Sequence, residues 1–277
     1  MSTDPIITNQ PIPPAQAPGS LKSRLRLHQQ FPCELMEEKR DFIVYLPPMY
    51  GAEPERRYPT LYLQDGQNLF DPDTSFILGK YWRVGETADE LTVTGAIEPL
   101  VIVGIYNTGE RRIDEYTHIE DKRLGGGQAD AYGRMLVGEL KPFVDHHYRT
   151  LPGIENCGLG KSSLGGLVSM YLALRYSGVF GKLAVMSPSV WWRNRAILKT
   201  VAQLKRRPAL RIWLDIGTRE SQRALPDARA LKTALVNKGW KLGEDLCYTE
   251  VEGGHHDEVA WSQRVAPMLQ FLFPPRK

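Results

Sequence analysis

Short apolar runs recur along the chain and are separated by polar or glycine-containing turns. Most are four to eight residues long and rich in Val, Ile, Leu and aromatic residues, as is typical of strands. The run at 100–105, LVIVGI, has no polar position, which is typical of a strand buried on both faces of a sheet. The expected strands lie at residues 41–47, 60–66, 100–105, 182–187, 210–217 and 246–251, with a further short one just before residue 162.

Longer segments between these runs repeat their apolar residues every three or four positions, the spacing of an amphipathic helix. They lie at residues 85–93, 129–147, 164–176, 224–238 and 259–272, and Pro142 is expected to kink or divide the second. Strands that alternate with helices predict an α/β fold, with a mostly parallel central sheet and helices on both faces. We find no internal repeat and expect one domain over residues 21–277. Residues 1–20, which are rich in proline and polar residues, predict a flexible N-terminal arm.

Charge and composition narrow the functional classes. The formal net charge of the chain is +3 and its clusters of basic residues are short, so we expect no nucleic-acid partner. No apolar run is long enough to span a membrane, and the N-terminus lacks the pattern of a signal peptide. A cytoplasmic protein with no membrane partner is therefore expected. The cysteines Cys33, Cys157 and Cys247 are far apart, which disfavours a metal site or a disulfide framework.

The segment LGKSSLGG, residues 159–166, lies between an expected strand and an expected helix. Small residues around a serine at such a turn are typical of the nucleophile elbow of α/β hydrolases, G-x-S-x-G. If Ser163 is the nucleophile, Gly165 fills the last glycine position of the motif but Lys161 stands in the first. If Ser162 is the nucleophile, Gly160 fills the first position but Leu164 stands in the last. We prefer Ser163. A phosphate-binding loop would need a glycine where Glu155 stands, and an ordinary structural turn remains the alternative.

A nucleophilic serine needs a base and a carboxylate that orients it. The two histidines downstream are His255 and His256, on a glycine-rich loop before the last helix. Among carboxylates, Glu220 is best placed, after the turn that ends the preceding strand. Asp215 lies inside that strand and is expected to bond backbone amides instead, and Asp227 lies further on, in the next expected helix.

Several segments together resemble the putative esterase family of α/β hydrolases. These are YPTLYLQDGQNLFDP, VIVGIYNTGERRIDEYT, SSLGGLVSMYLAL, MSPSVWW, LDIGTRE and EGGHHDEVAW. The family includes siderophore trilactone, feruloyl and acetyl-xylan esterases, and the resemblance, strongest to its single-domain predicted-esterase branch, covers almost all of the chain after the arm. It implies Ser163, His256 and Glu220 as a catalytic triad and the backbone amides of Gln67 and Leu164 as the oxyanion hole. It implies no metal and no organic cofactor.

The resulting prediction is a serine carboxylesterase that forms an acyl-enzyme on a small-molecule ester. An acyltransferase on the same scaffold, or a binding protein with a decayed elbow, are the alternatives. Substrate contacts are expected from Trp82, Arg111, Trp191 and Trp192, against the alternatives of core tryptophans and a surface arginine. Lys161 is expected to avoid an unpaired buried charge by reaching solvent, a carboxylate or backbone carbonyls, away from Ser163.

Overall fold

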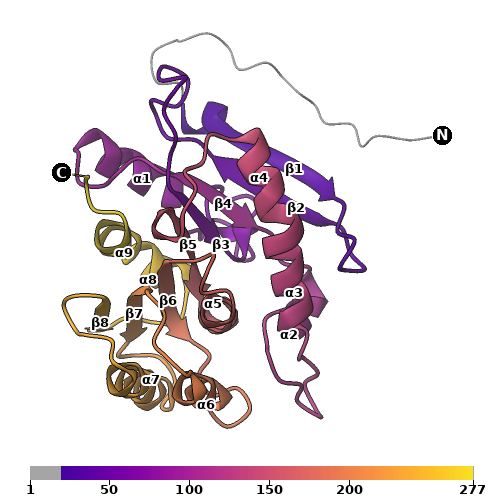
Figure 1. Cartoon of the computed structure of the whole chain (residues 1–277), viewed down its shortest axis with the longest axis vertical. Coiled ribbons are helices and arrows are strands. Elements are labelled where there is room, and N and C mark those ends of the chain that lie inside the picture. Colours follow the sequence, from indigo (N-terminus) through magenta and orange to yellow (C-terminus); the bar gives the residue numbers. More distant parts are fainter. Residues whose placement is uncertain (1–19, 277) are drawn as a thin grey trace.

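A computed structural model describes residues 20–276 of the chain, so the predicted N-terminal arm lies outside the described residues except for Ser20. One sheet runs through the described part, in the order β1-β2-β4-β3-β5-β6-β7-β8 (Figure 1). Its strands are β1 (Leu25–Phe31), β2 (Arg40–Tyr45), β3 (Thr60–Leu63), β4 (Val101–Ile105), β5 (Cys157–Ser162), β6 (Lys182–Pro188), β7 (Arg211–Gly217) and β8 (Leu246–Val251).

The sheet is mostly parallel, as the sequence predicts. β1 pairs with β2 and β2 with β4 in antiparallel fashion, and every pair from β4 to β8 is parallel. The central strands β3, β4 and β5 are buried at every position, which explains the apolar sequences of β3 and β4, whereas β5 buries Lys161 and Ser162 as well. The edge strand β1 was not predicted, because polar residues interrupt its sequence and none of its residues is fully buried.

Helices cover both faces of the sheet. They are α1 (Val84–Val93), α2 (Arg112–Glu115), α3 (Ala129–Met135), α4 (Lys141–His147), α5 (Ser163–Arg175), α6 (Ala196–Gln203), α7 (Ala224–Lys238), α8 (Glu258–Ser262) and α9 (Val265–Leu272). One core cluster joins alternate strand residues to α3–α7, and a second joins the other strand residues to α1 and α9. Figure 1 shows α5 and α9 on opposite sides of the central strands. The predicted α/β-hydrolase fold class is confirmed.

Two predicted helices are divided in the structure, and the first division lies next to Pro142 as expected. The segment 129–147 contains a wide turn at Leu136–Leu140, just before Pro142, which lies at the start of α4. Proline lacks an N–H, so a widened turn there accommodates the missing hydrogen bond. The segment 259–272 divides at Gln263 into α8 and α9. None of the helices within residues 20–276 is both long and apolar enough to cross a membrane.

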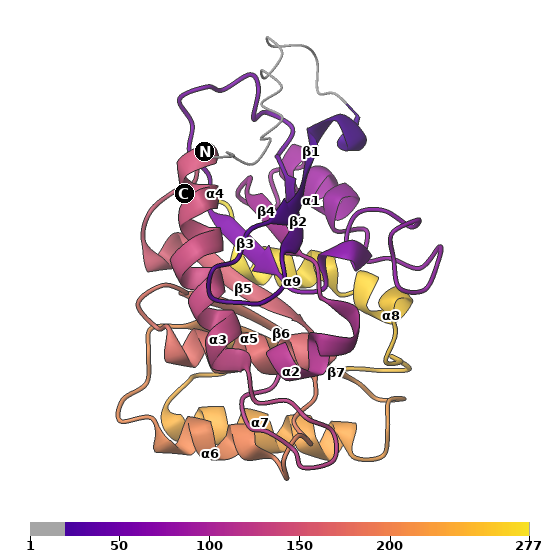
Figure 2. The same cartoon turned by 90° about the vertical axis from the view of Figure 1, so that its right-hand side faces the viewer.

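The carboxyl ends of the parallel strands lie at one edge of the sheet. The segments that follow β3, β5, β6, β7 and β8 all leave the sheet at this edge, where Figure 2 shows the ends of several of these elements close together. Ser163 follows β5, Glu220 follows β7 and His256 follows β8. In open α/β sheets this edge is the usual location of a ligand site.

Candidate active site

The turn between β5 and α5 holds Ser163 in an unusual backbone conformation. Its φ is +57°, in the left-handed region that non-glycine residues seldom adopt. The sequence permits the close approach of strand and helix at this turn because Gly160, Gly165 and Gly166 lie on either side of it. A Cβ atom on Gly160 would lie 2.5 Å from Cβ of Ala184, and one on Gly166 would lie 3.0 Å from the carbonyl oxygen of Lys161. A strained serine between a strand and a helix is the geometry of a nucleophile elbow.

Ser163, His256 and Glu220 form a continuous chain of polar contacts. Nε2 of His256 lies 3.0 Å from Oγ of Ser163, and Nδ1 of His256 lies 2.7 Å from Oε2 of Glu220. The sequence left His255 and His256 open on the residues alone, and in the structure it is His256 that faces the serine. The Oγ atom of Ser189, which sequence reasoning missed, lies 3.3 Å from Oγ of Ser163.

The Glu220 carboxylate is fixed and kept ionised by its surroundings. Its side chain is 1% exposed, whereas that of His256 is 42% exposed. Oε1 of Glu220 accepts hydrogen bonds from the Gly217 amide at 2.8 Å and from Oγ of Ser187 at 2.5 Å. Burial alone would raise the pKa of Glu220, but the hydrogen bonds from His256, Ser187 and Gly217 together hold that pKa below its ordinary value. A buried carboxylate is thereby available to orient the imidazole.

Lys161 does not behave as the sequence predicts. It is 1% exposed, and its Nζ atom lies 3.4 Å from the centroid of the Trp82 ring. Within the described part of the chain this nitrogen has no hydrogen-bond partner. The expected route to solvent, a carboxylate or a carbonyl is therefore wrong, because β5 is a central strand with both faces covered. The stem of the side chain lies under α5, where a Cβ on Gly165 would be 2.9 Å from Cβ and Cγ of Lys161.

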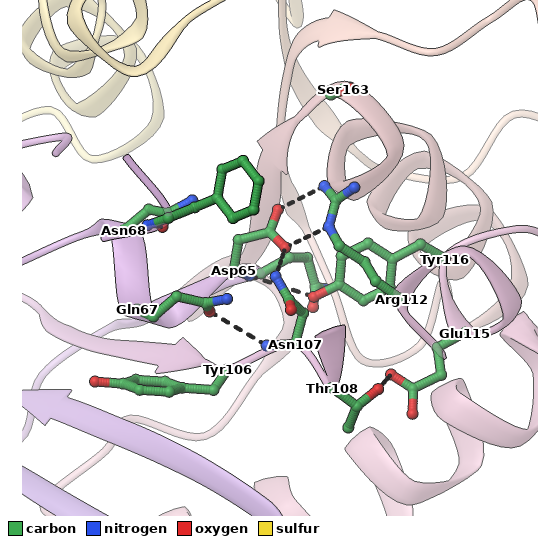
Figure 3. Close-up of polar contacts among 12 residues, drawn as sticks. Asp65, Gln67, Asn68, Tyr106, Asn107, Thr108, Arg112, Glu115, Tyr116 and Ser163 are labelled. Carbon is green, nitrogen blue, oxygen red and sulfur yellow. Dashed lines mark hydrogen bonds and ion pairs between the residues drawn. The ribbon is translucent and has the colours of Figure 1, made fainter. Parts of the chain in front are cut away.

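The loop after β3 carries Gln67, one of the two predicted oxyanion donors. Asp65 begins this turn with a φ of +50°, and its carboxylate receives hydrogen bonds from Nε and Nη2 of Arg112 at 2.7 and 2.8 Å. Figure 3 shows Asp65 and Arg112 facing each other below Ser163. A Cβ on Gly66 would lie 2.4 Å from the backbone of Gly104, so only glycine fits at that position. The other predicted donor, Leu164, follows Ser163 in the first turn of α5.

The predicted substrate contacts divide into buried and exposed residues. Trp82 is fully buried beneath Lys161, and Trp192 is 1% exposed with its Nε1 donating to the Ile119 carbonyl. Side chains without exposed surface cannot touch a substrate in this conformation, so both are corrected to core residues. Trp191 is 46% exposed and stays a candidate. Arg111 also stays one, although its guanidinium pairs with Glu37 and Glu38.

The sequence suggested that Asp215 bonds backbone amides, but the structure shows side-chain donors instead. The Asp215 carboxylate is fully buried and accepts hydrogen bonds from Nε1 of Trp213 at 2.6 Å and Nη1 of Arg264 at 2.8 Å. Asp227 lies in α7 and pairs with Arg195, away from His256. Arg264 was not singled out from the sequence, because nothing local to it distinguishes it from a surface arginine.

The described residues contain no cluster of three or more histidine, cysteine, aspartate or glutamate side chains suited to a metal ion. The polar groups at the carboxyl edge are instead arranged in a line that ends at the serine oxygen. That arrangement can transfer a proton from the serine hydroxyl to an imidazole whose other nitrogen faces a carboxylate.

Comparisons with known proteins identify the family of the chain. The family described as "Putative esterase" matches residues 33–272 of the chain. Uncharacterized protein YbbA of Bacillus subtilis (strain 168) is 27% identical over 247 residues, which cover 84% of this chain and 92% of YbbA. A protein of Xylanibacter ruminicola named endo-1,4-beta-xylanase/feruloyl esterase is 27% identical over 237 residues, which cover 83% of this chain and 29% of that protein.

Among solved structures, the enterobactin esterase Fes from Shigella flexneri, in the presence of 2,3-di-hydroxy-N-benzoyl-glycine, is similar with a TM-score of 0.69. The match covers 95% of this chain and 60% of that chain at 19% sequence identity, which is a likeness of fold. The family match spans most of the chain from Cys33 onward. The chain therefore belongs to the putative esterase family, and it is a carboxylesterase with the α/β-hydrolase fold.

Proposed function

We propose that this carboxylesterase works through a Ser163–His256–Glu220 triad and a covalent acyl-enzyme. The observation that carries the proposal is the unbroken contact chain, 3.0 Å from Ser163 to His256 and 2.7 Å from His256 to Glu220. Both distances are within hydrogen-bond reach without any rearrangement. The buried, hydrogen-bonded carboxylate of Glu220 supports its role as the group that orients the imidazole.

In the first half of the reaction, Oγ of Ser163 attacks the ester carbonyl carbon while Nε2 of His256 accepts the hydroxyl proton. A C–O bond forms and the carbonyl oxygen takes the negative charge. The backbone amides of Gln67 and Leu164 stabilise this oxyanion, each contributing about 3 kcal/mol to the lowering of the barrier. The tetrahedral intermediate then breaks its bond to the alcohol oxygen, which receives the proton from His256.

In the second half, water replaces the alcohol. His256 accepts a proton from the water as its oxygen attacks the acyl carbon. The second tetrahedral intermediate then breaks its bond to Oγ of Ser163 and releases the carboxylic acid, while His256 returns the proton to Oγ. Glu220 stays ionised and stabilises the imidazolium that forms in each half. Trp191, which is exposed, and Arg111, which is partly exposed, are the proposed contacts to the substrate.

Labelling and substitution test the assignment of the nucleophile. A fluorophosphonate probe is expected to modify Ser163, and Ser163→Ala is expected to abolish hydrolysis of p-nitrophenyl acyl esters. The matched control is Ser162→Ala, at the neighbouring serine that is 2% exposed and ends β5. Modification of Ser162, or full activity in Ser163→Ala, would contradict the proposal. Feruloyl esters and enterobactin, named for the relatives, belong in the same substrate panel.

A further inference from the structure

One guanidinium lies behind the triad and contacts three separate segments of the chain. Arg264 precedes α9 and its side chain is 3% exposed. Its Nη1 donates to Oδ1 of Asp215 at 2.8 Å and to Oγ of Ser187 at 3.0 Å, and its Nη2 donates to the carbonyl oxygen of His255 at 3.3 Å. The segments that it joins are β7, the end of β6 and the loop that carries His256.

These contacts lead directly to both partners of the serine. Ser187, which accepts from Arg264, donates its own hydroxyl to Oε1 of Glu220 at 2.5 Å. Nη1 of Arg264 lies 3.8 Å from the same Glu220 oxygen. On the other side, the His255 carbonyl is one residue from His256. Arg264 can therefore influence where Glu220 lies through Ser187, and where His256 lies through the backbone of His255.

The sequence leaves space for this side chain at two glycines. A Cβ atom on Gly217, where β7 ends, would lie 2.9 Å from Nη2 of Arg264. A Cβ atom on Gly254, just before the histidine pair, would lie 2.7 Å from the same nitrogen. Any other residue at position 254 would first meet the guanidinium, whereas one at position 217 would also clash with the Gly254 carbonyl oxygen, 2.3 Å away. The loops of Glu220 and His256 are thus shaped around Arg264.

The positive charge of Arg264 is surrounded by negative charges. Asp215 and Glu220 place two carboxylates around one buried guanidinium. Burial raises the pKa of Asp215 to about 6, although the Arg264 cation and the Trp213 hydrogen bond act in the opposite direction. Removing the cation would leave two carboxylates to repel each other in a site with little water.

We propose, building on the triad assigned above, that Arg264 is a positioning residue of the esterase. Its guanidinium, anchored on Asp215, holds Ser187 and the His255 carbonyl at fixed places and so keeps Glu220 and His256 aligned with Ser163. It does not touch the substrate. The bidentate, planar geometry of arginine is needed for this role, because a lysine ammonium offers charge without the fork that spans separate acceptors.

The decisive variant is Arg264→Lys, which keeps the charge and removes the fork. We expect kcat to fall by about 10- to 100-fold with KM changed less than about threefold, as for a small misplacement of catalytic groups. The readout that does not depend on turnover is the downfield proton resonance of the His256 Nδ1–H bonded to Glu220, identified by its loss in His256→Ala. This resonance is expected to weaken or move upfield in Arg264→Lys.

The matched control is Arg229→Lys on α7, where the arginine makes a bidentate pair with Glu250 away from the triad. It is expected to keep both kcat and the resonance. Should Arg264→Lys not fold, Asp215→Asn removes the anchor alone and is expected to give a smaller change in the same two readouts. Wild-type kcat and an unchanged resonance in the folded variants would overturn the proposal. Failure of the wild type to hydrolyse esters would instead overturn the proposed function, since the resonance still reports on Arg264.

Discussion

Nζ of Lys161 lies over the ring of Trp82, 3.4 Å from its centroid, in the interior of the sheet one residue before the turn to α5. Among the described residues it has no hydrogen-bond acceptor. The indole face attracts a cation, but burial of an ammonium without an acceptor is unfavourable. Burial lowers the pKa of Lys161 to about 7, and the nearby Asp65 and Glu258 only partly offset it. The side chain is therefore poised to lose its proton near neutral pH.

This lowered pKa predicts a pH dependence of folding stability. Between about pH 7 and the ordinary lysine pKa, the unfolded chain binds the proton at Lys161 and the folded chain does not, so stability rises with pH. The slope from this group approaches about 1.4 kcal/mol per pH unit. Urea unfolding of the wild type and of Lys161→Met at pH 7, 8 and 9 measures it. The slope is expected to disappear in Lys161→Met and to persist in Lys199→Met, at an exposed lysine of α6. Parallel pH curves for the wild type and Lys161→Met would refute this.

Gly165 and Lys161 are predicted to be energetically coupled. A Cβ at position 165 would lie 2.9 Å from Cβ and Cγ of Lys161, which is closer than such atoms approach in proteins. Gly165→Ala is therefore expected to destabilise the chain by about 1–3 kcal/mol, despite the better helix propensity of alanine. In the Lys161→Gly background the contact is absent and the cost is expected to fall. A double-mutant cycle of unfolding free energies measures the coupling, and additive values would disprove it.

The activity of Lys161→Gly is a separate expectation. The contacts among Ser163, His256 and Glu220 do not include Lys161. Its kcat is therefore expected to stay within about tenfold of wild type, because the proposed triad and the oxyanion amides are retained. A hundredfold fall at full folding would mean that the lysine takes part in the chemistry.

The two adjacent histidines are predicted to differ sharply in function. His256 contacts both Ser163 and Glu220, whereas His255 contributes its carbonyl oxygen to Arg264. His256→Ala is expected to lower kcat on the order of 10⁴-fold or more, as loss of a triad base does in other hydrolases. His255→Ala keeps the carbonyl and is expected to stay within about tenfold. Steady-state kinetics on a p-nitrophenyl ester separates them, and equal losses would contradict the assignment of the base.

Much of the fold follows from local sequence pattern. The parallel strands β4, β6 and β7 contain continuous apolar runs because both of their faces are covered, and α1, α5 and α7 carry clear helical spacing. The elbow turn is also visible in the sequence, since the glycines that it needs, Gly160, Gly165 and Gly166, lie within three residues of Ser163. The edge strand β1 was missed because polar residues interrupt it. Helix α6 does carry helical spacing, with Ala196, Ile197 and Val201 buried, but its eight residues are too few to stand out from the sequence.

Contacts between distant segments were not visible in the sequence. Ser187, Asp215 and Arg264 lie up to 77 residues apart, and no local spacing relates them. The burial of Lys161 and Trp82 depends on the place of β5 in the sheet. A residue inside a central strand has helices over both faces and no route to solvent, however polar it is, whereas Lys182 at the start of β6 is partly exposed. The local pattern of apolar residues indicates which segments form strands. The burial of a particular side chain depends instead on which strands become neighbours in the sheet.

The pair Asp65–Arg112 is predicted to hold the oxyanion loop in place. Asp65 is almost fully buried, adopts a φ of +50° and accepts from Nε and Nη2 of Arg112 and from Nδ2 of Asn107. Burial alone would raise the pKa of Asp65, but Arg112 outweighs it and lowers that pKa, so the carboxylate is charged at neutral pH. The next residues are Gly66 and Gln67, and the Gln67 amide is a proposed oxyanion donor. A shift of Asp65 would move that amide.

Asp65→Asn tests this relationship without changing the size of the side chain, and asparagine tolerates the same backbone conformation. The variant loses the charge that pairs with Arg112 but keeps one acceptor oxygen. We expect kcat to fall by about 10- to 100-fold, less than the loss of an entire oxyanion donor, because the amide acts mainly on the transition state. KM is expected to change little. The control is Asp130→Asn, a half-exposed aspartate of α3 that contacts Tyr171 and Arg175. A raised KM at unchanged kcat would show instead that Asp65 and Arg112 serve ground-state binding, because only uniform binding would then have been lost.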